Sequence, residues 1–301
     1  MIKTTPSAKS GSIRDFLALE RNVSVESIGG FIGVGFNAIW MPFMGIFMSE
    51  ILGFGDFLIG ISYTLDALAM GVVLRIGGYL SYRIGRKRTI IMGRCPWILM
   101  PILFLLSLNL GPYLSILAMA LHGVSLGLST PARSALIAES VRKERRGTAL
   151  MISTYVFPSL SPIAGAIIGG ILANQDAFEF MFFLGAFGLA VMTLVELTGL
   201  NETLREKPMQ HKNAKGRVGT VEGFILILAI AYALDAMSTQ AISWYVPLYV
   251  KELGFTNLDV GILYAILPAV IAVAALIGGK LTDSAGRYQT IIASWVELYF
   301  C

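Results

Sequence analysis

Charged residues and cysteines are both scarce in this sequence. Only 14% of the 301 residues are charged, whereas a soluble domain usually has about 25%. Two cysteines, Cys95 and Cys301, cannot build a disulfide framework. There is no H-E-x-x-H motif, no C-x-x-C pair and no phosphate-binding P-loop, so the sequence indicates no metal site, no cofactor and no nucleotide-driven reaction. Apolar sequence is abundant instead, because 55% of the residues are hydrophobic.

The apolar residues form runs long enough to cross a bilayer, for which a helix needs about 20 mainly apolar residues. The run from Cys95 to Ala132 is too long for one helix, and the turn signal Asn109–Pro112 divides it. A further span begins near Gln289, but the sequence ends at Cys301, before that span could cross. The pattern predicts an all-α membrane protein with spans near residues 27–49, 57–80, 89–108, 112–137, 148–173, 177–199, 223–250 and 258–281.

Two stretches of the chain match each other at one constant spacing. The segment GGYLSYRIGRKRTII at 77–91 aligns without gaps with GGKLTDSAGRYQTII at 278–292. Matches continue upstream at the same spacing, for example Tyr63 with Tyr264. An ungapped match over about forty residues indicates an internal duplication, and such repeats are typical of transporter folds. The repeat predicts two units of six spans, of which the second is incomplete in this chain.

The cationic turn of each copy carries a recognisable pattern, G-x-L-x-D-R-x-G-R-K. Its first copy supplies Gly78, Leu80, Arg83, Gly85, Arg86 and Lys87. This pattern resembles the loop between the second and third helices of the major facilitator superfamily of secondary transporters. Tyr82 stands where the family has an acid, whereas Asp283 supplies the acid in the second copy, followed by Gly286 and Arg287. The resemblance implies a major-facilitator-type helical bundle, with a six-helix N-terminal half and an incomplete C-terminal half. It also implies that these loops gate the cytoplasmic face.

The basic residues predict the orientation of the chain. Most Lys and Arg residues fall in segments that share a side with the N-terminus, and Lys251 alone lies in a predicted outer loop. We therefore expect a multi-pass plasma-membrane protein with a cytoplasmic N-terminus. The expected parts are a cytoplasmic N-terminal segment (1–26), a six-helix bundle (27–200), a cytoplasmic linker (201–222) and a partial second bundle (223–301). The net charge of +4 is dispersed among loops, which argues against a nucleic-acid partner.

Charged side chains inside the spans are costly in lipid and therefore mark structural or functional contacts. Asp66, His122 and Asp235 lie deep in their spans. They are the proton-binding candidates, because a desolvated carboxylate or an imidazole can titrate near neutral pH. A hydrogen bond between helices explains each of them equally well. Four others lie near cytoplasmic helix ends, where pairing or snorkelling is the favoured explanation: Arg75, Arg94, Arg133 and Glu196.

The resemblance also implies which residues face a central cavity, because the first, fourth and seventh helices line it in the superfamily. Mapped onto this chain, the expected set is Asn37, His122, Asp235, Gln240, Trp244 and Tyr245. For Asn37 and Gln240 the alternative is a contact between helices. For Trp244 and Tyr245 the alternative is the aromatic belt at the membrane surface.

The fifth span contains the sequence FPSLSPIAGAIIGG. Ser161-Pro162, Gly165 and Ala166 resemble a signature associated with antiporters and exporters. Gly165 and Gly169 also form a G-x-x-x-G face, for which close helix packing is the alternative explanation.

These patterns predict a secondary active transporter rather than an enzyme. It would move a small solute by alternating access, with proton-coupled efflux as the specific hypothesis, and its partners would be that solute, the lipid bilayer and protons. The G-x-S-x-G at 123–127 lies inside a predicted span and lacks the strand-turn-helix context of a nucleophile elbow. The alternative is a truncated or frameshifted permease fragment with no transport activity of its own.

Overall fold

The computed structural model describes residues 20–204 and 245–285, and the regular structure in these ranges is entirely helical. Within them, each span begins and ends within a few residues of a predicted one. The predicted span at 223–250 lies outside the described residues, except for helical residues 245–250, and the beginning of the ninth lies outside them altogether. Among the described residues, seven helices are long and apolar enough to cross a membrane: Arg21–Ile51, Asp56–Ile84, Arg86–Leu110, Leu114–Ser140, Arg146–Ala173, Phe178–Gly199 and Asn257–Ala275. This confirms the all-α membrane fold class.

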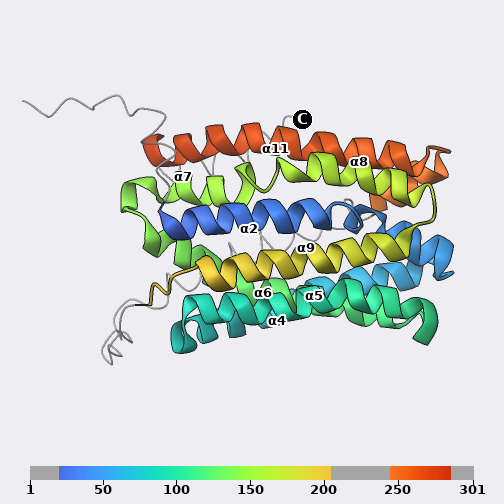
Figure 1. Ribbon diagram of the computed structural model, residues 1–301, viewed down its shortest axis with the longest axis horizontal. Helices are drawn as coiled ribbons and strands as arrows, with labels where there is room; N and C mark the ends of the chain where they lie inside the picture. The colour runs from blue at the N-terminus through green and yellow to red at the C-terminus, as the bar shows by residue number, and fades with distance from the viewer. Residues whose placement is uncertain (1–19, 205–244, 286–301) are drawn as a thin grey trace, which may run out of the picture.

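The helices run side by side as a bundle of rods (Figure 1). On one side, α4 (Asp56–Ile84) and α5 (Arg86–Leu110) both pack against α6 (Leu114–Ser140). In the middle lie α2 (Arg21–Asn37) and α9 (Phe178–Gly199). On the opposite side, α11 (Asn257–Ala285) lies along α7 (Arg146–Met151) and α8 (Ser161–Ala173). In the described residues, the second half is therefore represented mainly by α11. This helix contacts the fifth span of the first half, which consists of α7, η4 and α8.

The two ends of the bundle differ in charge. The α4–α5 turn and the segment Arg142–Arg146, which includes the short helix η3 (Lys143–Arg145), lie at one end, here called the basic end. The opposite end is called the far end. Helix α2 begins at Arg21, so the predicted bound at residue 27 is six positions too late. Glu26, assigned from sequence to the polar N-terminal segment, is therefore helical and fully buried.

Two of the spans are interrupted rather than straight. After α2 ends at Asn37, the first span continues through the short segments η1 (Met41–Phe43), α3 (Met44–Ile46) and η2 (Phe47–Ile51). Between α7 and α8, the fifth span contains the π-helical segment η4 (Ile152–Val156). A proline lies beside each interruption, Pro42 in the first span and Pro158 in the fifth. Proline favours an interruption because it lacks the backbone N–H group that would continue the helical hydrogen bonds.

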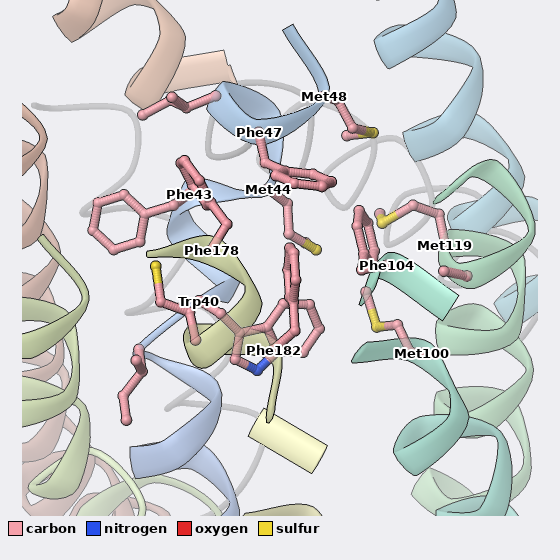
Figure 2. Close-up of a cluster of buried hydrophobic side chains, with 14 of the residues drawn as sticks. Trp40, Phe43, Met44, Phe47, Met48, Met100, Phe104, Met119, Phe178 and Phe182 are labelled. Atoms are coloured by element: carbon pink, nitrogen blue, oxygen red, sulfur yellow. The ribbon is translucent and has the colours of Figure 1, made fainter. Parts of the chain in front are cut away.

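A hydrophobic cluster fills the bundle around the interrupted part of the first span (Figure 2). Phe47 meets Phe182 of α9 with ring centroids 4.8 Å apart, and Phe182 stacks on Phe104 of α5 at 5.3 Å. Trp40 is 1% exposed and lies edge-on to Phe182. Aromatic and methionine side chains contribute large apolar areas here and fill the space left by the broken helix.

The G-x-x-x-G face of the fifth span is a packing face. A Cβ added at Gly165 would collide with the carbonyl oxygen of Gly35, and one at Gly169 with that of Ile39. Both carbonyls belong to the first span. The two glycines therefore allow α8 and the first span to approach backbone to backbone.

Candidate functional site

The structure brings together two of the three proton-binding candidates. Nδ1 of His122, on α6, lies 3.0 Å from Oδ1 of Asp66, on α4, in a buried contact. The two helices can approach this closely because of Gly123, where an added Cβ would collide with the carbonyl oxygen of Asp66. Asp66 lies ten residues after the start of α4, which corresponds to about 15 Å along the helix. The pair is therefore well inside its span.

The cavity-facing position that the resemblance implies for His122 stays a prediction. The described neighbours of its imidazole are Asp66 on α4 and Trp97 on α5, whose ring centroid lies 6.1 Å from that of the imidazole. Residue His122 is 4% exposed and Asp66 is 8% exposed. The pair therefore lies at the interface of α4, α5 and α6, within the first half of the molecule.

Among the described residues, the other candidates for solute or proton contact, Asn37 and Tyr245, make their own contacts away from this pair. Asn37 is buried at the end of α2, and its amide nitrogen contacts Sδ of Met41 at 2.9 Å, so its described contact is within its own span. The hydroxyl of Tyr245 donates to the backbone carbonyl of Asp56 at 2.9 Å, which joins the second half to the start of α4. Asp235, Gln240 and Trp244 lie outside the described residues.

The predicted gating turn is built around one buried cation. Arg86 is 2% exposed and donates to Glu139 of α6 at 2.9 Å and to Ser81 of α4 at 2.8 Å. The ring of Tyr82 lies 4.1 Å from the guanidinium carbon of Arg86. At the position where the family has an acid, this chain thus uses a cation–π contact. The acid that pairs with Arg86 comes instead from the neighbouring helix, as Glu139.

Glu202, just after α9, closes the other side of this turn. Its carboxylate accepts the backbone N–H groups of Arg86 at 2.8 Å and Lys87 at 3.2 Å, the first residues of α5. Free N–H groups at a helix N-terminus favour a carboxylate in this way. Gly85 connects the helices with a φ of +112°, a conformation that other residues rarely adopt. A Cβ there would also collide with the Glu202 carboxylate.

The other residues of the predicted turn are less involved. Arg83 is exposed and contacts Tyr79, one helical turn earlier. Among the described residues, nothing lies within 4 Å of a Cβ added at Gly78. Its neighbour Gly77 instead makes a close helix contact, against the backbone of Gly127 and Leu128 on α6. Gly286 and Arg287 lie outside the described residues, and so does the side chain of Asp283.

A second group of buried charges lies two helical turns from the basic end. Arg94 of α5 donates twice to Glu196 of α9, with both distances 2.7 Å, and these residues are 3% and 0% exposed. Nε of Arg133, on α6, lies 2.6 Å from Oε2 of Glu26 on α2, in a charge contact without an aligned hydrogen bond. Arg133 also donates to the carbonyl of Ser153 in η4. The expected structural use of Arg94, Arg133 and Glu196 is thus confirmed.

Sequence reasoning missed three residues of these groups. Glu26 lies close to the polar N-terminal segment, and Glu202 lies in a polar segment, so neither stood out as a buried or capping acid. Trp97 is one of many aromatic residues in apolar sequence. The glycines at 29 and 30, one turn after Glu26, are the signal that could have placed this acid in a packed helix.

Comparison with known proteins connects this arrangement to one family. A family scan matches residues 27–298 to the Major Facilitator Superfamily. The chain belongs to the Major Facilitator Superfamily. It is 27% identical over 292 residues to the multidrug resistance protein MdtG of Citrobacter koseri, covering 92% of this chain and 70% of that relative. It is 26% identical to the protein of the same name from Proteus mirabilis, with 91% and 70% covered.

Solved structures agree on the superfamily fold. The crystal structure of a D-xylose-proton symporter matches with a TM-score of 0.55 at 13% identity, covering 90% of this chain and 70% of that one. A bacterial homologue of human drug peptide transporters matches with a TM-score of 0.51 at 18% identity, covering 87% and 56%. The six spans of the first half and the described part of the second thus follow the fold of these structures. Family membership points to transport across a membrane rather than to enzymatic chemistry.

Proposed function

We propose that this superfamily member is a proton-coupled secondary transporter that exports small organic solutes. The observation that carries the proposal is the buried contact between Asp66 and His122, 3.0 Å apart inside the bundle. A carboxylate and an imidazole held together away from water can store one proton and release it when their surroundings change. Among the described residues, no group of three or more His, Cys, Asp or Glu could hold a metal ion.

The chemistry of the pair determines which nitrogen takes up the proton. The Asp66 carboxylate accepts a hydrogen bond, so Nδ1 of His122 carries the hydrogen between them. Nε2 then carries the lone pair that can accept a proton, and the resulting imidazolium forms an ion pair with Asp66. Since α4 carries Asp66 and ends at the gating turn, proton uptake at the pair can bias the position of α4.

The gate itself would be the cluster around Arg86. Its contacts with Glu139 and Glu202 attach the α4–α5 turn to α6 and to the segment after α9. Thr203 reinforces them by donating to Glu139 at 2.6 Å. For the basic end to change conformation, this cluster must break or move as a unit. We place this end on the cytoplasmic side of the plasma membrane, in accordance with the distribution of basic residues.

Export and the solute class follow from the relatives and from the fifth span. The curated relatives are named multidrug resistance proteins, which favours apolar organic compounds as solutes. The Ser161-Pro162 and Gly165 pattern, which resembles the signature of antiporters, points in the same direction.

The test is a transport assay with the purified 301-residue chain in liposomes. Ethidium, an aromatic lipophilic cation, serves as the organic probe, and a trapped pH dye reports proton movement under an imposed pH gradient. We expect ethidium-dependent proton movement that is lost in Asp66→Asn and in His122→Gln. Asp176→Asn is the matched control, because Asp176 is an exposed acid with a φ of 54°, which asparagine also tolerates.

Each result of this assay has a defined meaning. Ethidium movement that persists unchanged in both variants would overturn the proton site but not the transport function. If the chain moves neither ethidium nor protons while correctly inserted, the proposal of transport by this chain is overturned. The alternative of an inactive permease fragment would then hold.

A further inference from the structure

One aromatic ring lies between two of the buried ionic pairs of the first half. Trp97 lies on α5, three residues after Arg94, so both side chains share one helix face. The guanidinium carbon of Arg94 is 5.1 Å from the centroid of the Trp97 ring. His122 lies 6.1 Å from that ring by centroid distance, with its plane tilted by 56°. The indole thus contacts an arginine that is paired with Glu196 and a histidine that is paired with Asp66.

Hydrogen bonding of Nε1 does not account for the buried position of Trp97. Trp97 is 8% exposed, and its Nε1 has no hydrogen-bond partner among the described residues. A buried tryptophan usually finds a partner for this N–H group. The interactions that the described structure offers Trp97 are those of its ring, whose face attracts cations more strongly than that of any other side chain.

We infer that Trp97 is a positioning residue for proton binding at His122. Its π-system stabilises the imidazolium that forms when Nε2 accepts a proton, while Asp66 holds the other ring nitrogen. The same ring also attracts Arg94, so the proton site and the Arg94–Glu196 ion pair share one contact. The inference rests on the proposed proton coupling and adds to it the residue that adjusts proton affinity.

The charged and titratable groups around His122 come from both helices packed against it. Asp66 belongs to α4, where Tyr63 lies one turn before it, and Arg94 belongs to α5, on the other contact of the indole, in an ion pair with Glu196. Removal of the ring therefore deletes a favourable contact without deleting a charge.

The direct test is a pH titration of His122 by nuclear magnetic resonance. The sequence has two histidines, so His211→Gln leaves His122 as the only signal from isotope-labelled histidine. In this background, we expect Trp97→Leu to lower the proton affinity of His122 roughly two- to fivefold, the equivalent of about 0.5–1 kcal/mol for a cation–π contact at long range. Trp97→Phe keeps a π-face and should retain part of the affinity, since no described partner of Nε1 is lost.

Trp40→Leu is the matched control. It also removes a buried indole without a described N–H partner, but it lies in the hydrophobic cluster rather than beside His122. Equal proton affinities in the parent, Trp97→Leu and Trp97→Phe proteins would overturn the inference, and so would an equal loss in Trp40→Leu. If His122 takes up no proton in the parent at any pH at which the protein stays folded, the proposed proton site itself fails. That outcome is distinct, because it needs no variant of Trp97.

Discussion

At the scale of single residues, the pairing of buried charges has the largest consequence for stability. Arg94 and Glu196 are almost inaccessible and make two parallel hydrogen bonds, so each charge is compensated only while the other is present. Such a pair contributes little net stability relative to apolar side chains of the same size. The loss of one partner is expensive, because it leaves the other charge buried and unpaired.

This asymmetry predicts the outcome of three replacements. Glu196→Gln should lower the free energy of unfolding by about 3–5 kcal/mol, whereas the double replacement Arg94→Met/Glu196→Leu should remain close to the parent. Reversible unfolding of the purified protein in mixed detergent micelles measures both. Arg83→Gln, at an exposed position, should change the free energy of unfolding by no more than about 0.5 kcal/mol. A double replacement that is as damaging as the single one would contradict this account.

The sequence predicted these residues unevenly, for a physical reason. Asp66 and His122 stood out because polar groups are rare in apolar spans, and their joint position was then a matter of geometry between two helices far apart in sequence. Glu26 and Glu202 were hidden, because an acid next to a polar segment looks solvated until the helix ends are known. The pairing of charged groups depends on which helices are adjacent in the bundle, and the lengths of the spans do not reveal this.

At the scale of helices, close packing depends on which face a glycine occupies. Gly77 and Gly78 are adjacent in α4, yet only Gly77 faces the backbone of α6. Gly123 and Gly127 continue this close contact from the α6 side, against the backbone of Asp66 and Met70. The close packing that brings Asp66 and His122 together thus extends along α4 toward the α4–α5 turn.

Because Gly77 and Gly78 are adjacent but differ in their contacts, alanine replacement at Gly78 serves as the control for alanine replacement at Gly77. Gly77→Ala should destabilise the protein by about 1–3 kcal/mol, because the added methyl group forces α4 and α6 apart. Gly78→Ala should leave stability unchanged or raise it by up to about 1 kcal/mol, since alanine favours a helix and the space is open. Thermal unfolding of the two variants in the same detergent measures the difference. Equal effects would show that α4 and α6 do not touch at this point.

The boundaries of the helices were largely predictable, because a run of apolar residues has to match the thickness of the bilayer. Interruptions within the spans were less so. The π-helical turns at Phe47–Ile51 and Ile152–Val156 are not evident from the apolar runs, because the length of a span carries no information on the hydrogen-bond register inside it. The internal repeat was the most informative pattern, because it predicted the architecture of both halves before any contact was known.

At the scale of the whole molecule, the described contacts between the halves include several at the far end. Lys251 forms an ion pair with Glu50 at 3.4 Å, and Tyr245 donates to the carbonyl of Asp56. Asn257, at the start of α11, donates to the carbonyl of Ala173 at the end of α8. The structure therefore represents a state in which these parts of the far end are joined. Alternating access requires that such contacts separate during each cycle.

This requirement leads to a cross-linking prediction. In a background in which Cys95 and Cys301 are replaced by serine, Glu50→Cys/Lys251→Cys should react with a short bis-maleimide to join the two halves. A protease site inserted into the predicted linker at 201–222 makes the link visible, because joined halves stay together on a denaturing gel. If the proposed transport cycle operates, the cross-link should also stop ethidium movement in liposomes.

The control for this experiment moves the first cysteine to the opposite end of the bundle. Arg83→Cys/Lys251→Cys also has one thiol on each side of the cleaved linker, but the two thiols lie at opposite ends of the bundle, separated by about the length of the 29-residue helix α4, which is about 43 Å, so the short reagent should not connect them. The first pair fails the prediction if it links no better than this control. Transport that continues at full rate through a complete cross-link would be equally decisive, because a far end that never opens cannot release a solute there. Restored transport after cleavage of a reducible version of the reagent would separate a trapped conformation from a damaged protein.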